Sequence, residues 1–115
     1  MKLRIHGNAL RLRLDSSEVA QLQETGMCTE SLRFAPGSQL TYTLETSSQV
    51  TAMDAQYQQD CIRILLPLDL AQEWAESDRV SLSLHHTEVG PSLLIEKDFP
   101  CVHREPGAGK DEVEM

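Results

Sequence analysis

Hydrophobic and polar residues alternate along several short segments of this chain. Residues 10–14 show the pattern most clearly, because leucine occupies every second position and Arg11 and Arg13 lie between the leucines. Such alternation predicts a strand with one buried face. Similar patterns predict further strands at residues 2–6, 28–34, 40–45, 51–57, 62–66, 80–86 and 93–99.

Two segments have the residue spacing of short helices. Residues 15–25 carry Asp15 and, three positions later, Glu18, which is a helix-capping pattern. Gly26 suits the end of this helix. Residues 67–77 start at Pro67, which is favoured at the first helical position. The predicted buried stripes comprise Val19 and Leu22 in the first helix, and Leu70, Ala71 and Trp74 in the second.

The strand and helix patterns occur twice, 52 positions apart. We interpret them as two β-α-β-β(-β) repeats, with halves at about residues 8–58 and 61–99, that share one hydrophobic core. This predicts an α+β fold with two short helices and a mainly antiparallel curved sheet or half-open barrel. The aligned residues include Leu10 and Ile62, Leu12 and Ile64, Leu14 and Leu66, Leu22 and Trp74, and residues 31–32 and 83–84.

Composition and charge restrict the classes of function. The chain has 115 residues and a formal net charge of −8, which argues against a general nucleic-acid binder. It has neither an apolar run of the roughly 20 residues that span a bilayer nor the apolar region of a signal peptide. We therefore expect a cytoplasmic protein. Three widely separated cysteines are not a disulfide framework.

The last residues differ in composition from the rest. We expect one domain over residues 1–103 and a disordered acidic tail over residues 104–115, which is rich in glycine and acids and poor in large apolar side chains. Asp111, Glu112 and Glu114 could bind a basic partner or fold back on the arginines described next. A solubilising end is the simpler alternative.

Arginine is concentrated on the predicted strands. Five of the seven arginines lie on the side of a strand opposite its aliphatic residues. If those strands are neighbours, the guanidinium groups converge and suit a carboxylate or phosphate. The alternative is that they only form cross-strand ion pairs with Glu30, Glu45 or Glu96. The five candidate anion ligands are Arg4, Arg11, Arg13, Arg33 and Arg63.

A second candidate site lies near the end of the last strand. Glu96, Asp98, Cys101 and His103 include the residue types that bind zinc and other divalent metals. Structural zinc sites usually contain two closely spaced ligand pairs, and only one such pair is present here. The alternative is a final strand with ordinary solvated charges.

Other reactive residues form weaker patterns. Only one of the adjacent His85 and His86 could join His6 or His103, because neighbouring strand residues point to opposite faces. Cys101 with His103 or His86 could form a nucleophile pair, but no orienting third residue is recognisable. We also find neither a glycine-rich phosphate loop nor a serine nucleophile elbow.

Both ends of the domain resemble a known family. Residues 1–14, MKLRIHGNALRLRL, are similar to the opening of a family of small bacterial proteins that is catalogued only as a domain of unknown function. The family usually has Ser where this chain has Ala9. Residues 95–102, IEKDFPCV, resemble its usual close, VEKDFxCL. Residues 40–45 and 71–74 are also similar. The resemblance implies a soluble bacterial protein with an acidic tail, and it implies no activity.

Three hypotheses for function follow. The leading one is a non-enzymatic binding module that uses its arginine face for an anionic ligand or an acidic partner segment, without a cofactor. The second is a small metal-dependent enzyme or metal-binding protein centred on Cys101 and His103, with Glu96 or Asp98 assisting. The third is a structural homodimer, since exposed edge strands favour pairing between copies.

Overall fold

The computed structural model describes residues 1–84 and 90–99. In these residues it contains two helices and a set of strands, which confirms the predicted α+β class. Neither helix combines the length and apolar character needed to cross a membrane. The elements are β1 (Lys2–His6), β2 (Ala9–Leu14), α1 (Ser16–Thr25), β3 (Met27–Ala35), β4 (Ser38–Ser47), β5 (Asp54–Gln58), β6 (Cys61–Pro67), α2 (Leu68–Glu76), β7 (Ser81–Leu84) and β8 (Ser92–Lys97).

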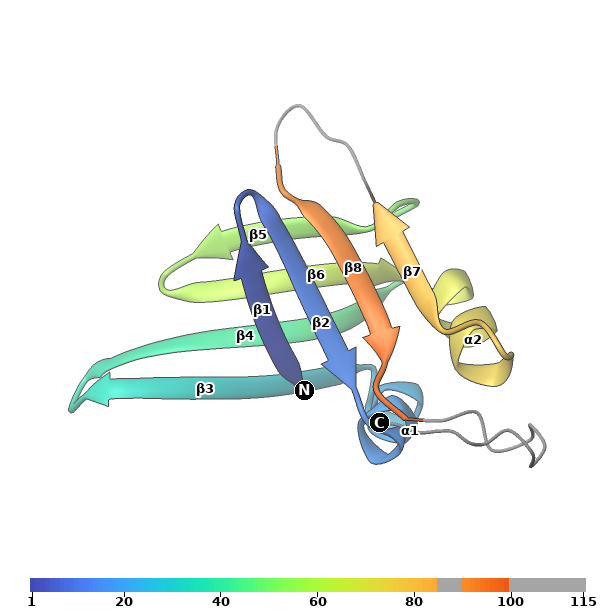
Figure 1. The fold of residues 1–115 in the computed structure, drawn as a ribbon, viewed down its shortest axis with the longest axis horizontal. Coiled ribbons are helices and arrows are strands. Elements are labelled where there is room, and N and C mark those ends of the chain that lie inside the picture. Colours follow the sequence, from blue (N-terminus) through green and yellow to red (C-terminus); the bar gives the residue numbers. More distant parts are fainter. Residues whose placement is uncertain (85–89, 100–115) are drawn as a thin grey trace.

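The strands form two four-stranded sheets. We name the sheet with order β1-β2-β8-β7 the A sheet, and the sheet with order β3-β4-β6-β5 the B sheet. Each consists of two antiparallel hairpins joined by a parallel pair, which is β2 with β8 in the A sheet and β4 with β6 in the B sheet. The expected single curved sheet or half-open barrel is therefore wrong. The physical reason is that each helix carries the chain from one sheet to the other (Figure 1).

The strand registers confirm the internal repeat. Leu12 on β2 lies opposite Ile95 on β8, and Ile64 on β6 lies opposite Leu44 on β4. Leu12 and Ile64 are 52 positions apart, whereas Leu44 and Ile95 are 51 apart. The two central strand pairs are thus equivalent. The repeated unit is β-β-α-β-β, so the expected β-α-β-β(-β) unit is wrong. The first unit begins with β1, and β5 pairs with β6 at the start of the second unit instead of ending the first.

The expected alignment fails after the helices. Ser83 lies opposite Leu94, and Thr29 lies opposite Thr43. Leu94 and Thr43 are equivalent, so Ser83 corresponds to Thr29 and not to Ser31. The expected match of residues 31–32 with 83–84 is therefore wrong by two residues. The connection from α2 to β7 is longer than that from α1 to β3, so the offset increases from 52 to 54.

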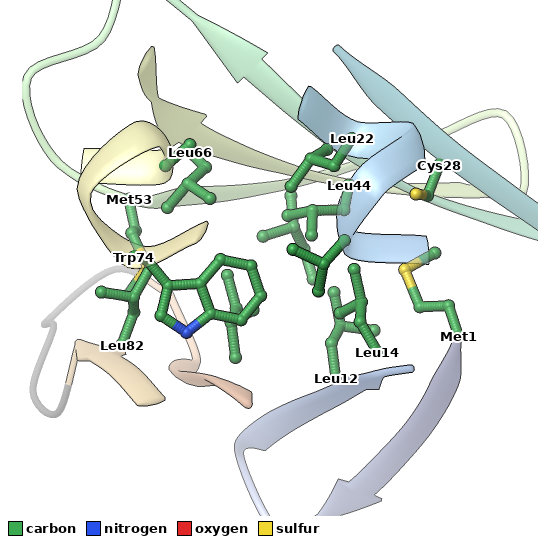
Figure 2. Packing of buried hydrophobic residues seen from close by; sticks show 14 of the residues in the cluster. Met1, Leu12, Leu14, Leu22, Cys28, Leu44, Met53, Leu66, Trp74 and Leu82 are labelled. Carbon is green, nitrogen blue, oxygen red and sulfur yellow. The ribbon is translucent and has the colours of Figure 1, made fainter. Parts of the chain in front are cut away.

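The hydrophobic core lies between the two sheets and beneath the helices (Figure 2). The strands of the two sheets cross each other in Figure 1, and both helices lie at the same end. Cys28 is buried, and burial is the main cause that raises the pKa of its thiol. The largest fully buried side chains come from both sheets and from α2: Leu12, Leu14, Leu44, Ile64, Leu66, Trp74, Leu82 and Ile95.

The helix ends combine predicted and unpredicted contacts. Asp15 and Glu18 form the expected reciprocal capping box of α1, and Gly26 ends the helix with φ of 81°. Pro67 precedes α2 as its N-cap and does not occupy the expected first helical position. At the other end of α2, the Lys97 ammonium donates to the Ser77 carbonyl oxygen at 2.8 Å. This contact satisfies a carbonyl group near the end of the helix.

The amino group of Met1 is enclosed by two carboxylates. It donates to Glu18 and, at 2.6 Å, to Glu30. Burial acts to lower the pKa of this amine, but its hydrogen bonds to Glu18 and Glu30 and their charges outweigh burial and raise it. Glu30, the polar exception on the apolar side of β3, therefore has an interior partner.

The hairpin of β3 and β4 extends past the edge strand β1 (Figure 1). Because the A sheet does not cover this end, apolar residues on the core-facing side of the B sheet become exposed. Leu32 is 54% exposed and Phe34 is 69% exposed. Ile5 on β1 and Tyr57 on β5 are also more than half exposed.

Candidate anion-binding site

The outer face of the A sheet is the most basic surface built by the predicted strands. Leu12 and Ile95 point into the core, so the residues between them along each strand point outward. This face carries four basic side chains and two carboxylates, which leaves an excess of two positive charges. The six charged residues on this face or at the end of β8 are Lys2, Arg4, Arg11, Arg13, Glu96 and Asp98.

Two carboxylates neutralise part of this surface. Arg11 donates from Nε to Glu96 at 2.8 Å and approaches the same oxygen with Nη2 at 2.7 Å. Arg13 pairs with Asp98 at 2.8 Å, and Lys2 reaches Asp98 at the same distance. The hydrogen bond from Lys2 is the main cause that lowers the pKa of Asp98, and the nearby charge of Arg13 adds to it.

Arg4 lies directly opposite Arg11 across the antiparallel hairpin of β1 and β2. Like charges at such positions destabilise a sheet. Within residues 1–84 and 90–99, Arg4 has neither a hydrogen bond nor an ion pair. Nε of Arg13 is also buried without a hydrogen-bond partner. The face therefore retains hydrogen-bond donors that Glu96 and Asp98 do not satisfy.

A pocket of about 400 Å³ lies next to Arg4 and Arg11. Its position coincides with small outward residues, since Ala9 on β2 lies opposite Ser92 on β8. The larger side chains around them form its walls. The lining residues are Arg4, His6, Ala9, Leu10, Arg11, Ser92, Leu93 and Leu94.

Arg33 and Arg63, the other two predicted anion ligands, lie on the B sheet. They point to its outer face, which is the opposite side of the molecule from Arg4, Arg11 and Arg13. The five arginines thus belong to two surfaces. Arg63 donates from Nε and Nη2 to Glu45 at 3.0 and 2.9 Å, and from Nη1 to Gln56 at 3.2 Å. The bond from Arg63 is the main cause that lowers the pKa of Glu45.

The two ion pairs occupy equivalent positions in the two halves. Arg11 corresponds to Arg63, and Glu96 corresponds to Glu45, by the offsets that relate the strand registers. The surroundings of the two pairs differ. Where the B sheet has Gln56, which accepts a hydrogen bond from Arg63, the A sheet has Arg4. The ion pair is therefore common to both halves, whereas the guanidinium group of Arg4 has a neutral amide at its equivalent position.

A larger depression of about 620 Å³ lies beside the start of α2. Its lining includes Asp69 and Glu73 together with hydroxyl groups and aliphatic side chains. Basic side chains do not contribute to the lining that the structure describes. Electrostatics therefore make this depression a poorer anion site than the pocket beside Arg4.

The predicted metal ligands are only partly described. Glu96 and Asp98 both contact Arg13, at 3.7 and 2.8 Å. Cys101 and His103 lie outside the described residues, as do His85, His86 and the acidic tail. Among the residues that are described, no group of three or more histidines, cysteines and carboxylates is close enough to hold a metal.

Sequence reasoning missed the residues that complete the pocket. Ala9, Ser92 and Leu94 carry no charge, so nothing about them alone indicated a site. The useful signal was the spacing of β1 and β2, which are joined by the two residues Gly7 and Asn8. A two-residue turn fixes the hairpin register, and that register places Arg4 opposite Arg11.

Comparison with known proteins gives one result. Searches of curated proteins and of solved structures both found no match. Residues 1–114 match the model of DUF7009, described as a family of unknown function. This agrees with the resemblance at the two ends of the domain. The chain therefore belongs to the DUF7009 family.

Proposed function

We propose that this protein is a non-enzymatic binding module that holds an anion on the outer face of the A sheet. The observation that supports the proposal is the juxtaposition of Arg4 and Arg11 beside a pocket. Arg11 already has Glu96 as a partner, whereas Arg4 has none in the described part of the chain.

The internal repeat strengthens this proposal. At the equivalent position of the B sheet, the neutral Gln56 accepts a hydrogen bond from Arg63. The A sheet replaces that acceptor with a second cation. An anion between Arg4 and Arg11 would supply the missing acceptor and relieve the repulsion between the two guanidinium groups.

A small anion fits the surface better than an acidic protein segment does. The excess positive charge next to the pocket is concentrated at Arg4, and Asp98 neutralises much of the charge on Lys2 and Arg13. A long acidic segment would have to pass close to Glu96 and Asp98. The proposal therefore places the ligand in the pocket and not along the whole face.

Thermal unfolding in different anions tests the proposal. Phosphate and acetate, at a constant ionic strength set with chloride, should raise the melting temperature of the parent protein. Arg4→Gln should abolish that increase, since it installs the side chain that the B sheet already carries at this position. Arg33→Gln is the matched control, because it removes an exposed strand arginine from the opposite face. If neither anion stabilises the parent protein, or if both variants respond alike, the proposal is wrong.

Self-association is the second candidate, and exposed apolar side chains on both sheets favour it. Leu32, Phe34, Ile5 and Tyr57 are each more than half exposed. An aromatic side chain buries about 150–250 Å² when fully covered. Phe34 and Tyr57 are about two thirds exposed, and Leu32 and Ile5 are more than half exposed, so the four together offer on the order of 400–500 Å². This is about half of the ~800 Å² that each partner of a stable complex buries. A second copy that places its own extended hairpin against this surface would supply the remainder.

Sedimentation at increasing protein concentration tests self-association. The parent protein should form dimers, and Phe34→Ser should weaken them strongly. Met27→Ser is the control, because Met27 is 44% exposed on the other face of the same strand. A monomeric parent protein at all concentrations would eliminate this candidate.

A further inference from the structure

The pocket beside Arg4 and Arg11 has two chemically different sides. Arg4, His6 and Arg11 contribute nitrogen donors on one side. The outward side chains of Ala9 and Leu94 form an apolar part of the remaining lining, and Ser92 adds a hydroxyl group. Leu10 and Leu93 also border the pocket, but their side chains lie on the core-facing side of their strands. A ligand that satisfies both sides needs an anionic group and an apolar portion.

The volume of the pocket also favours a ligand larger than a simple ion. The pocket measures about 400 Å³, which is within the range of small-molecule sites. At about 30 Å³ for each water-sized group, it has room for on the order of a dozen such groups. Acetate or phosphate alone would leave most of this space to water.

The charges around the pocket favour a singly charged group. Glu96 places one negative charge against Arg11, at 2.7 and 2.8 Å from two of its nitrogens. Among the described residues that line the pocket, Arg4 is then the guanidinium group without a counter-charge. Because Glu96 would repel a second negative charge, a monoanion matches this environment better than a phosphate dianion does.

The orientation of Arg11 favours a carboxylate. Glu96 occupies the Nε side of its guanidinium group, and no partner of Nη1 lies in the described chain. In the equivalent Arg63, Nη1 donates to the amide oxygen of Gln56. A planar carboxylate has two oxygens, so one can accept from Nη1 of Arg11 and the other from Arg4.

From these observations we infer that the ligand is a monocarboxylate with an apolar body of about four to eight carbons, an order of magnitude set by the pocket volume. The carboxylate lies between Arg4 and Arg11, and the apolar body covers Ala9 and Leu94. This inference rests on the proposed function and specifies its ligand class. Each methylene group that the pocket buries should increase the affinity about fourfold.

A titration series measures this dependence directly. Acetate, butanoate, hexanoate and octanoate are titrated into the full chain at constant ionic strength, with phosphate and neutral hexanol for comparison. Affinity should rise from acetate to hexanoate by about fourfold per methylene and then level off as the pocket fills. Arg4→Gln should weaken all the carboxylates.

A second variant keeps the test independent of the arginines. Leu94→Ser removes an apolar wall and should reduce hexanoate binding to the level of acetate, while acetate binding stays within twofold. Melting temperature without ligand establishes that the variant is folded. Arg33→Gln again serves as the control for charge.

The possible outcomes separate the ligand class from anion binding itself. Equal affinity for acetate and hexanoate, or tighter binding of phosphate than of hexanoate, would overturn the ligand class and leave the proposed anion site intact. Hexanol binding as tightly as hexanoate would also overturn it. If acetate, phosphate and the longer carboxylates all fail to bind, the ligand class and the proposed function are both wrong.

Discussion

The outer faces of the two sheets descend from the same structural pattern but differ in charge. Both carry an arginine on the central strand of the hairpin that begins a repeat, paired with a glutamate on the adjacent parallel strand. In the B sheet, the neighbours of Arg63 on this face are Gln56 and Leu65. At the equivalent positions around Arg11, the A sheet adds Arg4 and Arg13.

This difference gives the molecule an internal control. A contact present in both halves is explained by the needs of the fold, so the Arg11–Glu96 and Arg63–Glu45 pairs need no further function. A residue that is basic in one half and neutral in the other has no such explanation. Arg4 opposite Arg11 costs stability in a sheet, and binding of an anion would offset that cost.

The equivalence of the two halves within the core can be tested first, and with the largest effect. Leu12→Ala and Ile64→Ala each create a cavity at equivalent positions of the core, where the parent side chain is 1% exposed. Each should lower the free energy of unfolding by about 2–5 kcal/mol, measured by chemical denaturation. A loss below about 1 kcal/mol in one variant alone would contradict the shared core.

Removing the glutamate of each ion pair sharpens the comparison. Glu96→Gln leaves Arg11 beside Arg4 and Arg13 and should cost about 1–3 kcal/mol at low salt, as expected when a charged partner is lost. Glu45→Gln leaves Arg63 with Gln56 and should cost less than about 1 kcal/mol. The difference should shrink in high salt. Equal losses in denaturation experiments would mean that the two faces are electrostatically alike.

Exchanging the residues that differ should give opposite, smaller effects. Without a bound anion, Arg4→Gln should raise the free energy of unfolding by about 0.2–1 kcal/mol, because it removes a like-charge pair across β1 and β2. Gln56→Arg should lower it by a similar amount in the B sheet. Stability that falls in both variants would show that Arg4 has an unrecognised structural partner.

Acid titration should show the smallest effect. The pKa of Glu45 is lowered, mainly by the hydrogen bond from Arg63. Its stabilising effect is therefore complete above the ordinary glutamate pKa of about 4.3. The effect is lost as the pH falls from there through the lower pKa of the folded state. Glu45→Gln should lose less stability than the parent protein in this range. If the melting temperatures of the variant and the parent protein fall equally over this pH range, the assignment is wrong.

The sequence was sufficient to predict which face of a strand is buried but not which strands pair with each other. Alternation of leucine with Arg11 and Arg13 predicted which side chains face the core, because a strand has a strict period of two. The 52-residue repeat predicted equivalent surroundings for Leu12 and Ile64, and the registers agree. Which hairpins share a sheet depends on where each helix returns the chain, and local periodicity does not determine that.

The same distinction applies to the candidate site. The expectation that Glu45 and Glu96 could pair with strand arginines agrees with the contacts observed. The pocket required knowledge that β2 and β8 are adjacent, since Ala9 and Ser92 come from distant parts of the chain. The distribution of the five arginines over two faces likewise follows from the division into two sheets.

The most direct test of the account follows the side-chain Nε–Hε signals of individual arginines by NMR while hexanoate is added to ¹⁵N-labelled protein. We predict saturable shifts at Arg4 and Arg11, with the signals of Arg33 and Arg63 unchanged. Equal shifts at the arginines of both sheets, or no shift at Arg4, would contradict a specific anion site on the A sheet.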